Sequence, residues 1–395
     1  MDADDGPAPL KVAFITQTYH PVIGGAERQL QRLLPGIESR GVQPVVITRG
    51  LPGAPREETV DGVPVVRGGS VRQGAWGSLR FFLTALRELR RQRPDVVYAL
   101  SLMTPAMIGV AHRAFGGSPM LVKALRGGAL GDHDRIHRKP GYRLRCRLLR
   151  RGVDAAQVIS DEIDEEFALI GVPAERRHRI RNGVDVTALA PGRDGTGLRA
   201  SLDIAPEAPL FVYVGRLAAE KRVDLLIDAF ERLGERHPDA RLLVVGDGPE
   251  RDRLRSAATD DERVILFGPT DDVAEILAAA DVYVLPSSTE GMSNSLLEAM
   301  AAGLPIVATD VGAARELLGD EERGWVVPPE NASALERAML AALEERTTRE
   351  RGERARRYVS EHHSLDDTAE RLVRLCRELA RSAVPGPDGR HGASP

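Results

Sequence analysis

Residues 282–309 read VYVLPSSTEGMSNSLLEAMAAGLPIVAT, and their pattern indicates the fold class. An apolar run at Val282–Pro286 opens this stretch, and a second apolar run at Pro305–Thr309 closes it. Between them, Ser293–Ala302 has the spacing and length of a helix. A strand, a helix and a second strand in this order predict a βαβ unit with parallel strands. Continuous apolar runs further indicate a sheet that is buried on both faces.

The same alternation of short apolar runs and longer helical segments continues in both directions from this unit. The remaining apolar runs are Val12–Thr16, Val45–Thr48, Val63–Arg67, Val96–Leu100, Met120–Lys123, Ala156–Ser160, Leu210–Val214, Arg241–Val245 and Val264–Phe267. The pattern breaks at 186–209, which is rich in Gly, Pro and Asp and has little periodicity. We therefore predict an α/β protein of two Rossmann-like domains that face each other across a cleft.

The composition fits two globular domains and excludes several classes of protein. The 395 residues are enough for two hydrophobic cores. Lys and Arg total 54 against 58 Asp and Glu, a balance that disfavours a dedicated nucleic-acid binder. The only cysteines are Cys146 and Cys376, which excludes a disulfide framework or a cysteine-based zinc site. Because we find no signal peptide and no apolar stretch of about 20 residues, we expect a cytoplasmic protein.

Charge is distributed unevenly along the chain. Residues 1–190 carry 28 Lys and Arg against 20 Asp and Glu, whereas the rest carries 26 against 38. Within the basic half, residues 138–151 read RKPGYRLRCRLLRR and form a candidate basic amphipathic helix. Such a helix either makes a weak peripheral contact with anionic lipid, here at the inner face of the membrane, or presents a solvated Arg-rich face.

The loop at 287–295 is the strongest candidate for chemistry, because ligands of such sheets bind beyond the carboxyl ends of the strands. Residues 291–295 lie at the start of the helix, so their backbone N–H groups can form a cradle for an anion. Glu290 and Glu298 flank this cradle, and carboxylates beside an anion site suit hydroxyl groups. A nucleotide sugar supplies both phosphates and hydroxyls. A plain capped helix would explain Ser293 and the leucines but not the paired glutamates.

Two further loops have the composition of an anion site. Gly24 and Gly25 follow the first apolar run and precede a helix, where paired glycines permit the close approach of a ligand. In the second half, Gly215 and Arg216 follow an apolar run, and Lys221 opens the next helix. Two cations around a glycine turn suit a diphosphate. Each loop taken alone also fits a simple turn between a strand and a helix.

Taken together, these motifs resemble those of the retaining glycosyltransferases of the GT-B fold that carry a Glu-(seven residues)-Glu motif, glycosyltransferase family 4 with glycosyl transferases group 1. The resemblance extends over about residues 10–380. The stretches that carry it are Pro21–Glu27, Arg181–Asp185, Gly215–Arg216, Glu220–Lys221, Val245–Glu250 and Glu290–Pro305. It implies a GT-B fold whose C-terminal helix, 366–383, crosses back to the first domain.

The resemblance also implies a role for each matched residue. Arg216 and Lys221 would bind the donor diphosphate and Glu290 the transferred sugar, which makes these three the catalytic residues. Glu298 would hold the ribose hydroxyls of the donor. The other implied donor-binding residues are Gly24, Gly25, Gly215, Gly291, Met292, Ser293, Ser295 and Leu296, the last two through amides that reach the distal phosphate. The donor would be a nucleoside-diphosphate sugar, by expectation a UDP-sugar, with no metal and no further cofactor.

The acceptor side departs from the family pattern. Many relatives have a His-Gly pair after the run at Met120–Lys123, where this chain has Arg126 in place of the histidine. Arginine stays protonated, so it can bind an anion but cannot act as a general base. His20 and His133 are the other candidates for contact with the acceptor. The Asp-x-Asp triplet at 132–134 indicates a solvated loop rather than a metal site.

The predicted activity is the retaining transfer of a hexose-type sugar to a hydroxyl acceptor. That acceptor is either an envelope glycolipid or polysaccharide precursor, or a small natural product. Two alternatives stay open, a nonhydrolysing nucleotide-sugar epimerase and a non-catalytic nucleotide-sugar-binding subunit of a partner transferase. The predicted segments are a disordered tail at 1–9, the acceptor domain at 10–190, a linker at 191–208, the donor domain at 209–365, the returning helix at 366–383 and a disordered tail at 384–395.

Overall fold

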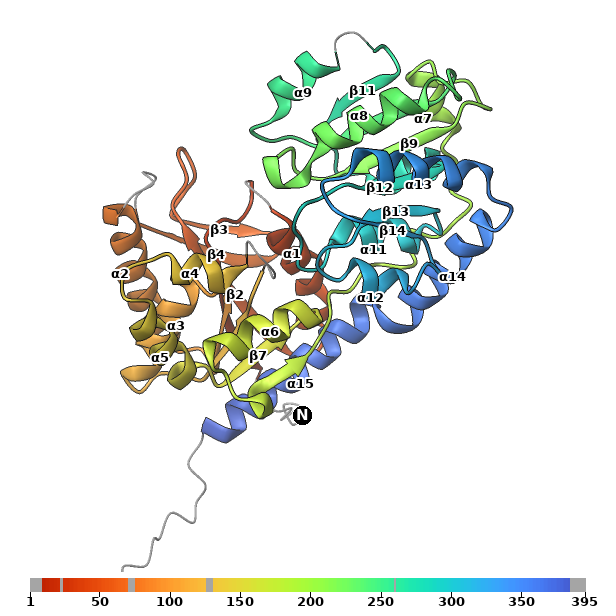
Figure 1. The fold of residues 1–395 in the computed structure, drawn as a ribbon. Coiled ribbons are helices and arrows are strands. Elements are labelled where there is room, and N and C mark those ends of the chain that lie inside the picture. The colour runs from red at the N-terminus through yellow and green to blue at the C-terminus, as the bar shows by residue number, and fades with distance from the viewer. Residues whose placement is uncertain (1–8, 22–23, 70–74, 126–130, 259–260, 384–395) are drawn as a thin grey trace, which may run out of the picture.

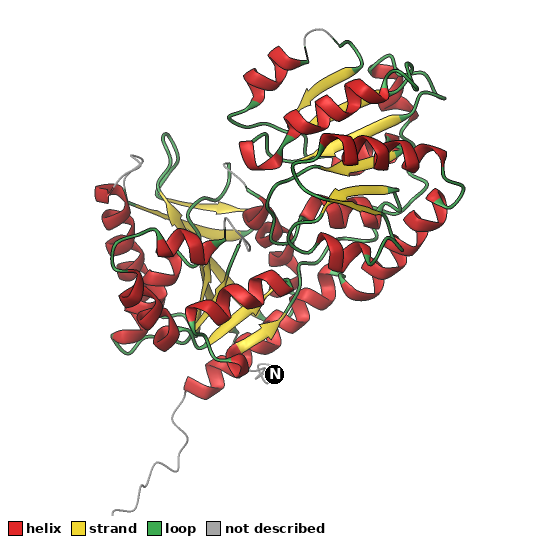
Figure 2. Ribbon diagram, viewed as in Figure 1, coloured by secondary structure: helices red, strands yellow, loops and turns green. Residues whose placement is uncertain are grey.

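A computed structural model of the chain describes residues 9–21, 24–69, 75–125, 131–258 and 261–383. It contains two α/β domains, with the C-terminal helices running along both of them (Figure 1). Helices pack on each sheet of mainly parallel strands (Figure 2). The predicted fold class is thereby confirmed. No helix in the described ranges is long and apolar enough to cross a membrane.

The first domain is built on one sheet with helices on both faces. Its strands are β1 Leu10–Ile15, β2 Val42–Arg49, β3 Glu57–Val60, β4 Val63–Gly68, β5 Val96–Leu100, β6 Met120–Lys123, β7 Ala155–Val158 and β8 Arg177–Arg179. Its helices are α1 Gly25–Glu38, α2 Ala75–Gln92, α3 Thr104–Ala114, α4 Asp132–His137, α5 Tyr142–Gly152 and α6 Asp161–Ile170. The strand order is β3-β4-β2-β1-β5-β6-β7-β8, with parallel pairing except between β3 and β4.

Successive side chains of β1 point to opposite faces of this sheet and join different cores. Val12 and Phe14 pack in the core that α1 covers, whereas Ala13 and Ile15 pack in the core that α2 covers. The strand is therefore buried on both faces, as its continuous apolar run predicts.

The second domain repeats the plan with a smaller sheet. Its strands are β9 Leu210–Val214, β10 Arg241–Val245, β11 Val264–Gly268, β12 Val282–Leu285, β13 Ile306–Thr309 and β14 Trp325–Val327. Its helices are α7 Thr196–Ser201, α8 Val223–Leu233, α9 Arg251–Ala257, α10 Val273–Ala279, α11 Asn294–Ala301, α12 Ala314–Leu318, α13 Ala332–Glu344 and α14 Thr348–His362. The order is β11-β10-β9-β12-β13-β14, and the described neighbours pair in parallel.

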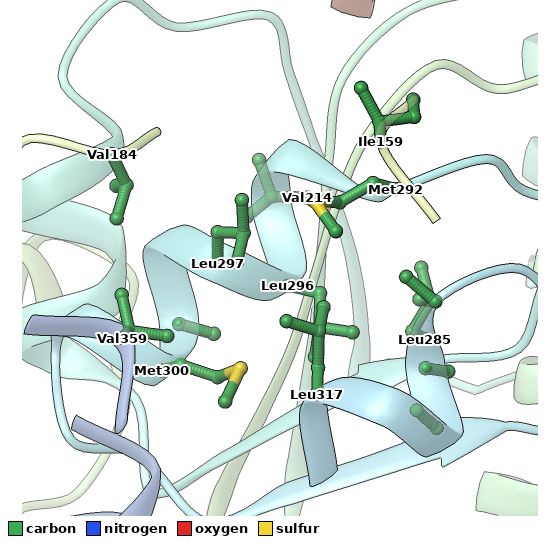
Figure 3. Packing of buried hydrophobic residues seen from close by; sticks show 14 of the residues in the cluster. Ile159, Val184, Val214, Leu285, Met292, Leu296, Leu297, Met300, Leu317 and Val359 are labelled. Carbon is green, nitrogen blue, oxygen red and sulfur yellow. The ribbon is translucent and has the colours of Figure 1, made fainter. Parts of the chain in front are cut away.

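The βαβ unit predicted at 282–309 is confirmed as β12, α11 and β13. The two strands pair in parallel from Tyr283 opposite Ile306 onward. Leu296, Leu297 and Met300 of α11 point into a buried cluster that Leu317 and Val359 complete, and Met292 lies beside Ile159 of the first domain (Figure 3). The start of α11 is thus packed against both domains.

The chain departs from the sequence-based expectation in the connecting segments. The segment predicted as a linker at 191–208 contains α7, which packs on α10 and buries Leu198, so it carries secondary structure that was not predicted. The basic helix expected at 138–151 begins only at Tyr142, because Gly141 before it has a left-handed backbone with φ of 78°. The short strands β3, β8 and β14 were not predicted.

The C-terminal helices join the two domains. α14 packs on α11 of the second domain, and α15 (Leu365–Ala383) packs on α1 of the first. Leu372, Val373 and Cys376 of α15 lie in the same core as Leu30 of α1. The predicted return of the C-terminal helix to the first domain is confirmed.

Candidate active site

Lys221 and Glu290, two of the predicted catalytic residues, lie in direct contact. Lys221 ends the short turn Ala219–Lys221 after β9, and Glu290 lies in the loop after β12. The Lys221 Nζ atom is 2.7 Å from Glu290 Oε1, which also accepts a hydrogen bond of 2.8 Å from Ser287 Oγ. Ser288 donates its backbone N–H to the Glu220 carbonyl at 2.9 Å. Side-chain and backbone contacts therefore both connect the two loops.

Arg216, the third predicted catalytic residue, is exposed at the end of β9. Its carbonyl accepts a 3.0 Å hydrogen bond from the hydroxyl of Tyr213, which fixes the turn. A Cβ atom on Gly215 would lie 2.5 Å from that hydroxyl, so the turn requires glycine. Within the described residues the Arg216 guanidinium has no ion pair, which leaves its charge available to a ligand.

The start of α11 presents backbone N–H groups, as predicted, with one exception. Within the described part of the chain, the N–H groups of residues 291–295 donate to no protein acceptor. Leu296 was predicted to present its amide to a phosphate, but its N–H donates instead to the capping Ser293 Oγ at 3.3 Å. The Ser295 hydroxyl accepts a 2.8 Å hydrogen bond from Tyr283, which holds the first turn over the sheet. The N–H groups without a protein acceptor thus end at Ser295, the last residue of the cradle predicted at 291–295.

Glu298 is buried and forms an ion pair with Arg32 of α1. The side chain of Glu298 is only 5% exposed and that of Arg32 is 30% exposed, so the pair is substantially shielded from water. Arg32 was not identified from the sequence, because nothing local connects two residues 266 positions apart. The first domain thereby supplies a cation to the predicted ribose-binding carboxylate.

The two glycines at the start of α1 play different parts. Gly24 donates its N–H to Glu27 Oε2 at 3.1 Å, and a Cβ atom there would lie 2.7 Å from that oxygen. A Cβ atom on Gly25 would meet only Asn294 Nδ2, at an ordinary contact distance of 3.7 Å. The Gly25 carbonyl accepts a 2.7 Å hydrogen bond from Asn294. The N-terminus of α1 therefore lies against the N-terminus of α11.

A buried polar chain, also missed from the sequence, continues from this contact. Asn182 donates to Asn294 Oδ1 at 2.9 Å and accepts at its own Oδ1 from Lys123 Nζ at 2.7 Å. Burial lowers the pKa of Lys123 to about 8, against a smaller opposing effect of Glu27. His363 contacts the Asn182 carbonyl at 3.0 Å through Nδ1, and burial lowers its pKa to about 4. Residues of both domains are tied together through these hydrogen bonds.

The structure describes two of the three acceptor-side candidates, His20 and His133, and their hydrogen-bond partners differ. His20 is exposed, and its carbonyl accepts a hydrogen bond of 2.6 Å from Arg67. His133 lies in α4, where its Nε2 is 2.8 Å from the Tyr142 hydroxyl. Burial, and then the neighbouring His137, lower the pKa of His133, which favours its neutral form. Arg126 lies outside the described residues.

The Asp-x-Asp triplet is helical, so its assignment to a solvated loop was wrong. Asp132 begins α4, is 1% exposed, and accepts a 3.0 Å hydrogen bond from the Leu125 N–H. Asp134 forms an ion pair with Arg138 one turn later. The described residues contain no cluster of three or more potential metal ligands.

The chain matches two family profiles and several known proteins. Residues 23–188 match the profile described as Glycosyltransferase Family 4, and residues 208–345 match Glycosyl transferases group 1. The chain is 30% identical over 340 residues to the lipopolysaccharide core biosynthesis glycosyltransferase LpsE of Rhizobium meliloti, covering 85% of this chain and 91% of that one. It is 32% identical over 349 residues to the 2-deoxystreptamine N-acetyl-D-glucosaminyltransferase of Streptomyces fradiae, covering 80% and 82%.

Solved structures of low sequence identity share the fold. A sucrose-phosphate synthase from Thermosynechococcus elongatus superposes with a TM-score of 0.80 at 22% identity, over 94% of this chain and 100% of that one. Anabaena Alr3699/HepE in complex with UDP-glucose gives 0.76 at 20% identity, over 93% and 100%. The paired loops after β9 and β12, the two matched profiles and the full-length relatives together show that this chain belongs to the GT-B glycosyltransferases, with a family 4 domain followed by a group 1 domain.

Proposed function

We propose that the protein is a retaining glycosyltransferase that moves a hexose-type sugar from a nucleoside-diphosphate sugar to a hydroxyl acceptor. The observation that carries this proposal is the contact of Lys221 with Glu290 beside the unpaired N–H groups of 291–295. The two loops thus bring together positive charge, which suits phosphates, and carboxylates, which suit sugar hydroxyl groups. A fold relative that binds UDP-glucose supports a UDP-sugar as the donor.

In the proposed reaction, the cations stabilise the departing nucleoside diphosphate. Arg216 and Lys221 face the phosphates together with the N–H groups at the start of α11, so negative charge that develops there meets preorganised positive charge. Before the donor binds, Lys221 and Glu290 satisfy each other, which avoids a partly buried unpaired charge. Diphosphate replaces Glu290 as the partner of Lys221, and the freed carboxylate accepts hydrogen bonds from the sugar. This use of Arg and Lys is why we propose a metal-independent enzyme.

Glu298 is proposed to hold the ribose while Arg32 holds Glu298. The ion pair engages Oε1 of Glu298, so ribose hydroxyls donate to Oε2. The contact also requires α1 and α11 to stay together, and the Gly25 to Asn294 hydrogen bond supports the same arrangement. We propose that the two domains close over the donor, which excludes water and limits hydrolysis.

Retention of configuration follows from attack by the acceptor hydroxyl on the face that the diphosphate leaves. The acceptor enters from the first domain and is an envelope glycolipid or polysaccharide precursor, or a small natural product. The two curated relatives, named for lipopolysaccharide core and for 2-deoxystreptamine, support one class each. The proposed setting is the cytoplasm, with a weak contact of 138–151 with the inner face of the membrane.

The test is a panel of nucleoside-diphosphate sugars incubated with the protein and a cell extract, with new glycosides detected by mass spectrometry. We expect one donor to give a glycoside whose anomeric coupling constant matches that of the donor, with the same rate when a chelator is present. Inverted product contradicts retention. Conversion of the donor without any acceptor identifies an epimerase, and tight nucleotide binding without turnover for any donor identifies a non-catalytic subunit.

A further inference from the structure

Of the six exposed large apolar side chains in the described part of the first domain, five lie on one layer of helices, and the sixth, Leu169, lies on α6. Trp76, Leu79 and Leu83 lie on α2, Phe115 follows α3, and Leu144 lies on α5. Trp76 is 80% exposed, Phe115 73% and Leu144 60%. α3 packs between α2 and α5, so the three helices form a continuous layer (Figure 1). Isolated exposed apolar residues need no explanation, but a group of them on one layer indicates a binding surface.

The apolar residues of α2 form a stripe that the domain core does not use. Positions 76, 79 and 83 are spaced by three and four residues, which places them on one face of the helix. The opposite face carries Phe81, Ala85 and Leu89, which are fully buried against the sheet. The helix therefore has two apolar faces, one inside and one in solvent.

The solvent-exposed faces of α2 and α5 also carry arginines. Arg80, Arg87 and Arg90 are exposed on the same side of α2 as Trp76. The only carboxylate within α2, Glu88, is buried and paired with Arg56 and Arg91. On α5, the exposed residues other than Leu144 are Arg143, Arg147, Arg150 and Arg151. The chain has no Asp or Glu from 135 to 153.

The apolar and basic parts are continuous across the layer. The Arg90 guanidinium lies 5.5 Å from the centre of the Phe115 ring, which connects α2 to the end of α3. Cations and apolar side chains on the same faces, with no exposed carboxylate among them, are complementary to anionic headgroups above a hydrocarbon layer. A tryptophan at the end of the stripe suits the interface between the two.

We propose that the outer faces of α2 and α5, with Phe115 between them, bind an anionic lipid bilayer. The part of this surface on α5 extends the weak contact proposed for 138–151 and rests on that proposal. The apolar stripe of α2 is independent of it. The first turn of α2 follows β4 on the side where the strands of this sheet end. Docking through α2 thus brings the bilayer beside the ligand-binding edge of the domain, which favours a lipid-linked acceptor.

The experiment measures sedimentation of the full-length protein with vesicles of phosphatidylcholine alone or of equal parts phosphatidylcholine and phosphatidylglycerol. We expect sedimentation with the anionic vesicles only, decreasing as salt is raised. Each basic residue near such a surface contributes roughly fivefold to binding. We therefore expect vesicle binding to fall about 100-fold or more in the variant with Arg143→Gln, Arg147→Gln, Arg150→Gln and Arg151→Gln. The matched control removes four exposed arginines in and next to α14: Arg346→Gln, Arg349→Gln, Arg354→Gln and Arg357→Gln. Equal sedimentation with both vesicle types, or with neither, would overturn the proposal.

Tryptophan emission tests the apolar stripe directly. The chain has two tryptophans, and Trp325 is only 6% exposed, so a change on adding vesicles reports Trp76. We expect a blue shift with anionic vesicles that Trp76→Ser removes, and weaker sedimentation of Leu79→Ser with Leu83→Ser. A wild-type dimer in solution that these substitutions convert to a monomer would instead assign the stripe to self-association. Nucleoside diphosphate binding, measured without vesicles, tests the proposed function separately.

Discussion

In the second domain two predicted donor residues are in contact, whereas the two described acceptor candidates of the first domain share no hydrogen-bond partner. Lys221 meets Glu290, and the loops that carry them share hydrogen bonds. His20 and His133 instead contact Arg67 and Tyr142, neighbours that have no evident part in binding a sugar. A diphosphate and a ribose are common to many donors, so the residues that bind them form compact motifs. Acceptors differ from enzyme to enzyme, and no comparable motif marks their site.

The largest expected effect is on the donor side of this comparison. Lys221→Ala is expected to lower the turnover rate about 100- to 1000-fold, because it removes a cation from the departing diphosphate. Lys11→Ala is the matched control, since Lys11 is exposed near the start of β1 and distant in sequence from the paired loops. Single-turnover rates at saturating donor with a water-soluble acceptor give the answer. Equal rates for both variants would remove Lys221 from the proposed mechanism.

His363, in the buried polar chain with Asn182, makes the free energy of unfolding depend on pH. His363 has a pKa of about 4 in the folded protein, below its ordinary 6.5, because burial disfavours the charged ring. The unfolded chain therefore takes up the proton first as pH falls. The contribution of His363 is complete above pH 6.5 and is lost progressively down to about pH 4, a change of roughly 2–3 kcal/mol.

Urea unfolding of the wild type and of His363→Gln at pH 7 and pH 4.5 measures this contribution. The variant is expected to lose less free energy of unfolding between the two pH values than the wild type does. Glu166, whose pKa burial raises to about 7, acts with the opposite sign but is present in both proteins. Parallel losses in the two proteins would show that His363 does not titrate as its burial requires.

Substitutions at Gly24 and Gly25 distinguish an effect on nucleotide binding from an effect on stability. Gly25→Ala adds a methyl group that the protein itself accommodates at 3.7 Å, so the melting temperature is expected to stay the same. The methyl group obstructs a diphosphate that approaches the start of α1, and we expect about tenfold weaker nucleoside diphosphate binding. Gly24→Ala is the contrasting variant, because its methyl group meets Glu27 and lowers the melting temperature as well. Undiminished nucleotide binding by Gly25→Ala would place the donor away from this turn.

Arg32 tests how far the donor site depends on the first domain. Without the guanidinium, Glu298 is less firmly placed toward the ribose, so Arg32→Ala is expected to raise the donor KM about threefold to fivefold with little change in kcat. The control is Arg28→Ala, since among the described residues the ion-pair partner of Arg28 is the fully exposed Asp271, at 3.9 Å. A fall in kcat with unchanged KM would assign Arg32 to the chemical step instead. Initial-rate kinetics over a range of donor concentrations distinguish the two results.

The sequence predicts what depends on local pattern. Continuous apolar runs identify the main parallel strands. The glycine turn at Gly215 identifies the loop after β9, and the spacing of Glu290 and Glu298 identifies the loop after β12. Contacts between distant segments leave no such pattern, and for that reason Arg32 and the Lys123 to Asn182 hydrogen bond were missed. Capping by Ser293 was one of two interpretations left open, because a backbone N–H such as that of Leu296 can bond to a ligand or to a preceding serine, and composition does not distinguish the two.

His133, on the acceptor side, is expected to contribute little to the reaction. His133 packs on Tyr142 and His137 with a lowered pKa, so it is a neutral member of an aromatic cluster. His133→Asn keeps a polar side chain of similar size and is expected to change kcat/KM less than about twofold, within the range of a surface substitution. A 100-fold loss with unchanged nucleotide binding would mean that His133 contacts the acceptor after all. The first domain would then hold a compact acceptor site that has no recognisable motif in the sequence.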